Sequence, residues 1–321
     1  MTVRLAVEER PLGTSAVNVP RMMLGCGNFG GIGSAPAFFG QGLDRAAAFE
    51  LMDAAWELGV RHFDTADAYG GGRSEAMIGE WMRSNAVRPQ LTTKTYNPMG
   101  EGADHGLAPE RIERQLHSSL ERLGVDHVDL YLTHEHDPDV PADVVSGTLE
   151  LLRAEGLVRA VGVSNYDEAQ LREALAAGPL EAIQNSHSLL AREDEADVIP
   201  LCERERVSYT VFSPLAGGWL TGKYRRGEAF PEGSRMTQRP EGYASFLAGD
   251  RVFDGLERLK ALADEHGVSM AGLALSWLLA DPRICSIVVG PMRVGHLDPV
   301  REALATPLDD GARAEVGAVF G

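Results

Sequence analysis

The stretch DRAAAFELMDAAWELGVRHFDT, residues 44–65, holds the structural unit whose repetition decides the fold. Asp44 is a favoured helix N-cap residue, apolar side chains recur at helical spacing as far as Leu58, and Gly59 is a typical helix stop. A short apolar run that ends at Asp64 follows at once and predicts a strand. A helix that leads directly into a buried strand is typical of parallel β/α architectures.

The same alternation continues on both sides of this unit. Helices are expected over residues 74–82, 109–123, 141–155, from 167, and over 197–206, 251–266 and 269–280. Strands are expected in RMMLGCG near residue 24, RHFDT, QLTTK, HVDLYLT, LVRAVGVS, LEAIQ, VSYTVFS and ICSIVVG. Eight strands with crossover helices predict an α/β fold, a (β/α)8 TIM barrel that residues 1–321 form as a single domain. The stretch at about 214–250 is too long for a plain connection, and we expect a functional loop there.

The composition narrows the class of protein. Of the 321 residues, 44% are hydrophobic and 24% charged, which is the balance of a soluble globular protein and not of a disordered or fibrous one. A formal net charge of −17 argues against nucleic-acid and anionic-membrane partners, so any anionic ligand needs local Lys and Arg side chains. Cys26, Cys202 and Cys285 form no CxxC pair, and no apolar run is long enough to span a membrane. We therefore expect a cytoplasmic location.

Four residues with chemically active side chains stand at or just past the ends of short apolar runs: Asp64, Tyr69, Lys94 and His134. In a (β/α)8 barrel, the C-terminal ends of the strands carry the active site. A Lys ammonium within about 4–6 Å of a Tyr phenol lowers the phenol pKa from about 10, which favours proton donation near neutral pH. The alternative interpretation of Asp64 and Lys94 is a buried salt bridge that only fixes two strands.

Two other patterns suggest different functions. Gly25, Gly27 and Gly30 satisfy the dinucleotide-binding pattern GxGxxG, but no helix is predicted before Asp44, so we expect a glycine-rich loop at the mouth of the barrel. The segment His134, Glu135, His136, Asp137 has the HxH spacing of metal-dependent barrel hydrolases. The last strand ends in VVGP and offers no carboxylate ligand, so we expect no metal site and a solvated loop start instead.

Seven segments occur in the order and spacing of the aldo-keto reductases: FDTADAYGGGRSE, TTK, DLYLTH, GVSNY, IQNSHSLLAR, FSPLAGGWLTGKY and IVVGP. From residue 20 to about 305 the chain resembles this family, and it is most similar to bacterial members and to the potassium-channel β-subunit branch. The resemblance implies reduction of an aldehyde or ketone to an alcohol with NADP(H), although NAD(H) is not excluded. It implies that Tyr69 is the general acid, that Asp64 holds Lys94, which lowers the pKa of Tyr69, and that His134 orients the carbonyl oxygen.

The resemblance also implies a nicotinamide cofactor extended across the barrel mouth, with the 214–250 loop on the cofactor side. Ser164, Asn165 and Gln184 would hold the carboxamide, and Phe212 would stack on the nicotinamide ring. Ser213, Leu215 and Gly217 would bring backbone groups to the pyrophosphate. The cations implied for the 2′-phosphate are Lys223, Arg235 and Arg293. The remaining implied cofactor residues, beside the last strand, are Gly290, Met292 and His296.

The chain departs from the family pattern at several places. His187 stands where the family usually has Tyr, which predicts different local packing or a different substrate pocket. His296, Pro299 and Val300 stand where the family commonly has polar residues at the end of the cofactor site, so the preference between NADPH and NADH is open. Phe38 and Phe39 either line a substrate pocket or pack under a loop. A cofactor-binding regulatory or interaction subunit of the same fold, with little turnover, is the alternative function, and the sequence leaves the oligomeric state open.

Overall fold

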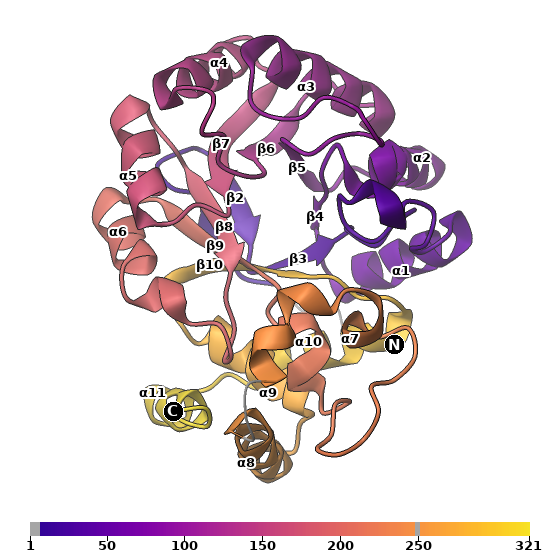
Figure 1. Ribbon diagram of the computed structural model, residues 1–321, viewed down its shortest axis with the longest axis vertical. Coiled ribbons are helices and arrows are strands. Elements are labelled where there is room, and N and C mark those ends of the chain that lie inside the picture. Colours follow the sequence, from indigo (N-terminus) through magenta and orange to yellow (C-terminus); the bar gives the residue numbers. More distant parts are fainter. Residues whose placement is uncertain (1–6, 248–250) are drawn as a thin grey trace.

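The computed structural model describes residues 7–247 and 251–321, and eight parallel strands close into a barrel within them (Figure 1). The neighbour order around the barrel is β10-β3-β4-β5-β6-β7-β8-β9, as a (β/α)8 fold requires. The strands are β3 (Met22–Gly25), β4 (His62–Asp64), β5 (Gln90–Thr95), β6 (Val128–Thr133), β7 (Val158–Ser164), β8 (Ala182–Ser186), β9 (Ser208–Phe212) and β10 (Ile284–Val289). The predicted fold class is confirmed, and all eight strands lie where the sequence pattern places them.

Helices surround the barrel and begin and end at residues that favour helix termini. The Asp44 side chain accepts a hydrogen bond from the Ala47 N–H, and Gly59 ends the same helix with φ of 108°. None of the described helices has both the length and the apolar character needed to cross a membrane. The α-helices are α1 (Arg45–Leu58), α2 (Arg73–Asn85), α3 (Pro109–Leu123), α4 (Ala142–Ala154), α5 (Glu168–Ala177), α6 (Val198–Glu205), α7 (Arg235–Gln238), α8 (Arg251–His266), α9 (Met270–Leu279), α10 (Asp298–Ala305) and α11 (Asp310–Gly317); short 3-10 turns are η1 (Pro36–Phe38), η2 (Tyr69–Gly72), η3 (Glu193–Glu195) and η7 (Val294–Leu297).

An N-terminal hairpin that the sequence interpretation missed closes the bottom of the barrel. Strands β1 (Glu9–Pro11) and β2 (Asn18–Pro20) pair antiparallel. Leu12 and Val19 belong to one buried cluster with Leu130 and Leu132 of β6 and other inward-facing strand residues. With this end filled by apolar side chains, the opposite end, where the strands terminate, is left for ligands.

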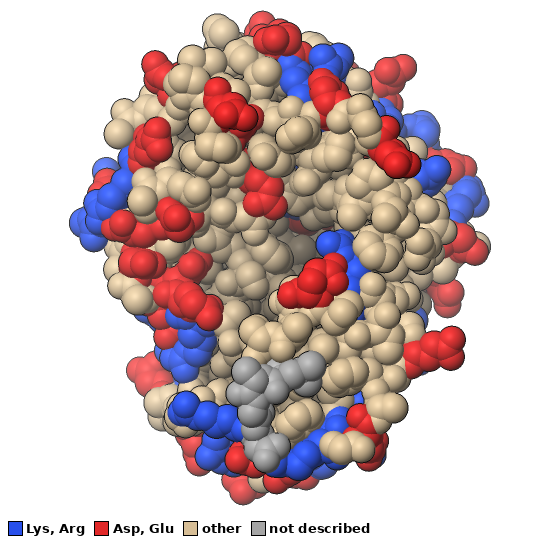
Figure 2. All heavy atoms as spheres, viewed as in Figure 1, with Lys and Arg blue, Asp and Glu red and all other residues tan. Residues whose placement is uncertain are grey.

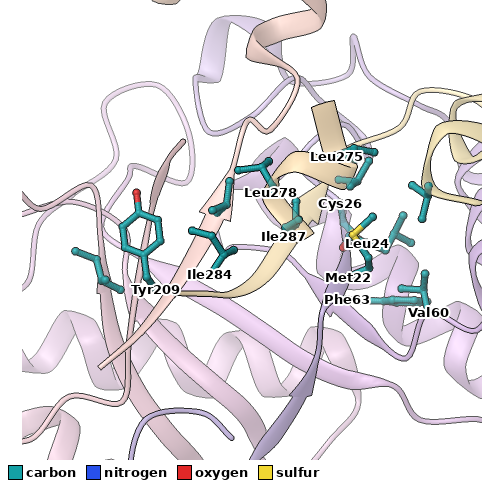
Figure 3. Packing of buried hydrophobic residues seen from close by; sticks show 14 of the residues in the cluster. Met22, Leu24, Cys26, Val60, Phe63, Tyr209, Leu275, Leu278, Ile284 and Ile287 are labelled. Carbon is teal, nitrogen blue, oxygen red and sulfur yellow. Dashed lines mark hydrogen bonds between the residues drawn. The ribbon is translucent and has the colours of Figure 1, made fainter. Parts of the chain in front are cut away.

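The barrel closes where β10 pairs with β9 on one side and with β3 on the other. Side chains from these strands form a continuous apolar layer beneath α9, with Tyr209 and Ile284 on one side of the seam and Met22 and Leu24 on the other (Figure 3). Strands that meet in register in this way place their C-terminal ends at one level, so residues distant in sequence share one face of the molecule.

The loop expected over 214–250 is more ordered than an irregular connection. It contains η4 (Ala216–Thr221), α7, η5 (Pro240–Gly242) and η6 (Ala244–Leu247), while residues 248–250 of the predicted loop lie outside the described residues. Trp219, which is fully buried, anchors the segment through ring contacts with Tyr224, Phe230, Phe246 and Phe253. This aromatic cluster lets a long segment keep one conformation beside the barrel mouth.

Candidate active site

The face that carries the strand ends is hollowed at its centre, with acidic and basic side chains at the rim (Figure 2). Asp64 is the last residue of β4, Lys94 lies near the end of β5, and His134 directly follows β6. Because these three strands are neighbours in the barrel, their ends bring the three side chains together. The Lys94 Nζ lies 2.5 Å from the Asp64 Oδ1.

The Asp64 carboxylate has partners on both oxygens and is almost completely buried. Lys94 donates to Oδ1, and the Gln184 side-chain amide donates to Oδ2 at 2.9 Å. The Lys94 ammonium also donates to the Thr65 carbonyl oxygen at 3.0 Å. Asp64 therefore fixes Lys94 in position, and Gln184 contacts Asp64, an interaction for which the sequence contains no local signal.

Tyr69 reaches this group from η2, the turn after β4. The turn is held by close backbone contact: Gly70 has φ of 59°, and a Cβ on it would lie 2.8 Å from the backbone of Gly30 in the glycine-rich loop. The centre of the Tyr69 ring lies 5.2 Å from the Lys94 Nζ and 5.5 Å from the centre of the His134 ring. The glycine-rich loop thus supports Tyr69, as a loop at the barrel mouth, and no dinucleotide-binding helix follows it.

The pKa of Tyr69 moves opposite to the expected direction. Burial raises it above its ordinary value, and the ammonium of Lys94 offsets this only in part. Lys94 thus acts on Tyr69 in the expected direction, but the net pKa is raised, because loss of water around a phenolate outweighs one nearby cation. Tyr69 is consequently protonated at neutral pH, the form that a general acid requires.

His134 is a neutral imidazole at physiological pH. Burial, together with the charge of Lys94, lowers its pKa to about 3. Its Nδ1 atom is buried and has no hydrogen-bond partner among the described residues. A neutral ring beside Tyr69 can donate one hydrogen bond without adding a second positive charge next to Lys94.

The three residues expected to hold a carboxamide form one hydrogen-bonded group at the ends of β7 and β8. Ser164 donates to the Gln184 carbonyl oxygen at 2.7 Å. The Asn165 side-chain amide donates to the His134 carbonyl oxygen at 2.9 Å and approaches the Glu135 carboxylate at 3.3 Å. The group therefore lies directly beside His134 and Asp64.

Strained backbone marks the segments expected to touch the cofactor. Of the five non-glycine residues with positive φ in the described chain, three are Asn165, Ser213 and Ala216. Such conformations cost free energy and concentrate at binding sites. Gly217, with φ of 62°, lies under the ring of Tyr243, whose hydroxyl is 3.1 Å from the Ser213 Oγ. Phe212 ends β9 and packs on the apolar layer inside the barrel, and Leu215 packs on the main core.

The predicted phosphate-binding cations gather on one side of the mouth. Burial, followed by the charge of Arg235, lowers the pKa of Lys223. Burial and the charges of Arg293 and Lys223 lower the pKa of His296, and the Arg293 Nε lies 3.0 Å from the His296 Nε2. Arg235 donates to the Asn28 side-chain oxygen at 2.8 Å, which links the loop after β9 to the glycine-rich loop. The only sequence signal for Asn28 was its place among those glycines.

Gly290 and Met292 follow β10 beside this cation group. Both are exposed, and Met292 is one of the few large apolar side chains on the described surface. Val300, by contrast, is buried against the barrel wall and cannot contact a ligand.

Phe39 packs over Gly71 near Tyr69, and Phe38 lies under the Arg239 guanidinium, so both aromatics are at the mouth.

In the segment from His134 to Asp137, which was considered for a metal site, two side chains make contacts within the protein. The Asp137 carboxylate accepts hydrogen bonds from the N–H groups of Leu107 and Asp139, at 2.6 and 3.0 Å. The His136 ring meets the Tyr166 ring edge-on. Across residues 7–247 and 251–321, no three His, Cys, Asp or Glu side chains come together in a way that could hold a metal ion.

His187 is a packing residue. It is fully buried, its ring lies 5.6 Å from the Trp277 ring and 6.0 Å from the Tyr209 ring, and neither ring nitrogen has a hydrogen-bond partner in the described structure. Of the two predicted consequences of this departure, changed local packing is the one that these contacts support. Burial lowers the pKa of His187 to about 4, despite Glu195 at 3.7 Å.

Replacing His187 with Phe should make the protein more resistant to acid. The pKa of His187 in the folded state lies below its unfolded value of about 6.5. Protonation of His187 therefore does not lower the free energy of unfolding above pH 6.5, but it lowers that free energy progressively as the pH falls toward 4. At pH 5 the loss amounts to about 2 kcal/mol, which His187→Phe should recover in urea unfolding at pH 5 relative to pH 8. The exposed His117→Gln is the control. An equal pH dependence of wild type and His187→Phe would contradict the prediction.

Comparison with known proteins relates this site to a family. The model of the Aldo/keto reductase family matches residues 21–319. The NADH-specific methylglyoxal reductase of Escherichia coli (strain K12) is 32% identical over 296 residues, covering 87% of this chain and 88% of the relative. A probable voltage-gated potassium channel subunit beta of Arabidopsis thaliana is 31% identical over 283 residues, covering 83% of this chain and 84% of the relative.

A solved structure shares the architecture. The glycerol dehydrogenase AKR11B4 from Gluconobacter oxydans superposes with a TM-score of 0.82 at 25% identity, covering 97% of this chain and 94% of that chain. The region matched by the family model contains all eight barrel strands and every candidate site residue described above.

Proposed function

The chain belongs to the aldo/keto reductase family of oxidoreductases, which use nicotinamide cofactors, and from this premise we propose that it reduces an aldehyde or ketone to an alcohol with NADPH. The observation that carries the proposal is the buried Asp64–Lys94 pair beside Tyr69 and His134 at the open end of the barrel. A proton donor, a fixed cation and a neutral imidazole around one space are what carbonyl reduction needs from a protein.

The residues beside this group fit a nicotinamide dinucleotide phosphate. Strained backbone at Asn165, Ser213 and Ala216 is typical of binding sites, and Gly217 and Gly218, which follow Ala216, have no side chains to keep a ligand from the backbone. Lys223 and Arg293 have no carboxylate within ion-pair distance in the described chain, although the protein carries a net charge of −17. Two unneutralised cations in so acidic a protein support a phosphate ligand. When bound, the nicotinamide supplies the hydride that reduces the carbonyl carbon.

The side chains of this protein would handle the proton. Tyr69 donates its phenolic proton to the carbonyl oxygen, and the ammonium of Lys94 stabilises the phenolate that remains. Asp64, held by Gln184, keeps Lys94 charged and in place. His134, neutral because its pKa is lowered to about 3, donates a hydrogen bond that orients the carbonyl oxygen.

A single-turnover experiment tests this function. Protein loaded with NADPH is mixed with a panel of small aldehydes and ketones, and the absorbance of the reduced nicotinamide is followed. Loss of absorbance with formation of the alcohol supports the reductase. NADPH binding without oxidation by any carbonyl would favour the second candidate, a cofactor-binding regulatory or interaction subunit, which the likeness to a potassium channel subunit beta keeps open.

The preference for NADPH is proposed from the cations alone, because one relative is named as NADH-specific. Arg293→Ala should weaken NADPH binding by about 10- to 100-fold, the usual value of one charge-assisted phosphate contact, and leave NADH binding nearly unchanged. Titration of protein fluorescence with each cofactor measures both affinities. The exposed Arg225, which pairs with Glu228, provides the control Arg225→Ala. Equal losses for NADPH and NADH would show that Arg293 does not read the 2′-phosphate.

The proposed location is the cytoplasm. Cys26, Cys202 and Cys285 are all buried and unpaired, which suits a reducing compartment.

A further inference from the structure

Glu135 is a carboxylate at the candidate active site that the proposed mechanism does not use. It directly follows His134, and its side chain is half-buried. The Asn165 amide, which donates to the His134 carbonyl oxygen at 2.9 Å, also lies 3.3 Å from the Glu135 Oε1. The carboxylate is therefore tethered beside two residues assigned to the carbonyl and the cofactor.

Among the described residues, no cation forms an ion pair with Glu135. Burial raises its pKa to about 7, and no basic group in the described chain counters that rise. Arg111, whose charge acts on the neighbouring Tyr96, is itself buried and donates to Thr95, to the Gly106 carbonyl and to the Asn97 carbonyl. A partly dehydrated carboxylate without a counter-ion is a costly feature to keep at a ligand site.

The charge around Glu135 differs from the charge on the cofactor side. Asp137 and Asp139 follow it on the same loop, and burial, followed by the charges of all three carboxylates, raises the pKa of Tyr96, which lies after β5. The cations Lys223 and Arg235 lie in the segment that contains α7, across the mouth from the ends of β6 and β7 (Figure 1). The site therefore has a basic side, which suits phosphate, and an acidic side near His134.

We propose that the carbonyl substrate carries an ammonium group and that Glu135 binds it, so that the protein acts on amino-aldehydes or amino-ketones. This inference rests on the proposed reductase function. An ammonium beside Glu135 replaces the missing counter-ion, while the carbonyl oxygen lies between Tyr69 and His134.

Pairs of substrates that differ only in charge test the proposal. Aminoacetone is compared with butanone, and a butanal with a terminal trimethylammonium group is compared with its neutral tert-butyl isostere. We expect wild-type kcat/KM to favour the charged member of at least one pair by about 10- to 100-fold at pH 8, and Glu135→Gln to abolish most of that preference. Asp139→Asn, which removes an exposed charge from the same loop, should leave the preference unchanged.

The outcomes separate this inference from the function on which it rests. Reduction of charged and neutral members with equal kcat/KM by wild type would overturn the role of Glu135 and leave the reductase intact. An equal loss of preference in Asp139→Asn would assign the effect to general acidity of the surface and would also overturn it. Oxidation of bound NADPH by none of the compounds, neutral or charged, would overturn the reductase function and this inference together.

Discussion

Tyr69→Phe should lower kcat/KM for any carbonyl substrate by about 10²- to 10⁴-fold, the usual contribution of a positioned general acid. The substitution removes the proton donor and leaves the ring, which packs 5.5 Å from His134, in place. NADPH affinity should change little, because the phenol hydroxyl is not among the groups assigned to the cofactor. Steady-state kinetics together with a binding titration measure both effects.

The chain provides a matched control for this substitution. Tyr131→Phe removes a hydroxyl from β6, the strand that precedes His134, where the group donates to the Ile112 carbonyl oxygen at 3.3 Å on the outer side of the barrel. Its kinetics should resemble wild type. If Tyr69→Phe kept more than about a tenth of wild-type kcat/KM, a loss of less than 1.4 kcal/mol in transition-state stabilisation, Tyr69 would not be the general acid.

Lys94→Met should destabilise the fold by about 3–5 kcal/mol as well as abolish most of the activity. The Asp64 carboxylate is 2% exposed, and without Lys94 its charge has only the Gln184 amide as a side-chain partner. A buried charge that loses its counter-ion is one of the most damaging changes known in protein interiors. Urea unfolding followed by circular dichroism measures the change in free energy.

A double variant distinguishes loss of the pair from loss of one partner. Lys94→Met combined with Asp64→Leu leaves no unpaired charge, so it should recover most of the stability while remaining inactive. Full stability in the Lys94→Met single variant would show that Asp64 is not an ionised partner of Lys94. Recovery of activity in the double variant would contradict the role of Lys94 beside Tyr69.

Much of the barrel could be read from local pattern. The run from Asp44 to Gly59 specifies its own helix through capping residues and apolar spacing, and the run to Asp64 specifies a strand, because both signals act over a few residues. The hairpin of β1 and β2 was missed, since its short strands are stabilised by contact with the inside of a barrel that the local sequence does not describe.

For the candidate site, the sequence located the residues but not their interactions. The quartet and the cofactor segments could be found because strand ends in this fold share one face. The link from Gln184 to Asp64 joins residues 120 positions apart, and the contact of Arg235 with Asn28 joins residues 207 apart, so neither has a local signal.

The sequence by itself determined the fold class and the identity of the four chemically active side chains, because periodicity, caps and motif spacing are local properties of the chain. Only the tertiary structure decided that the pKa of Tyr69 is raised and that Glu135 lies beside the Asn165 amide without a counter-ion in the described chain. Burial and through-space charge set both features, and they exist only once distant strands have closed into a barrel.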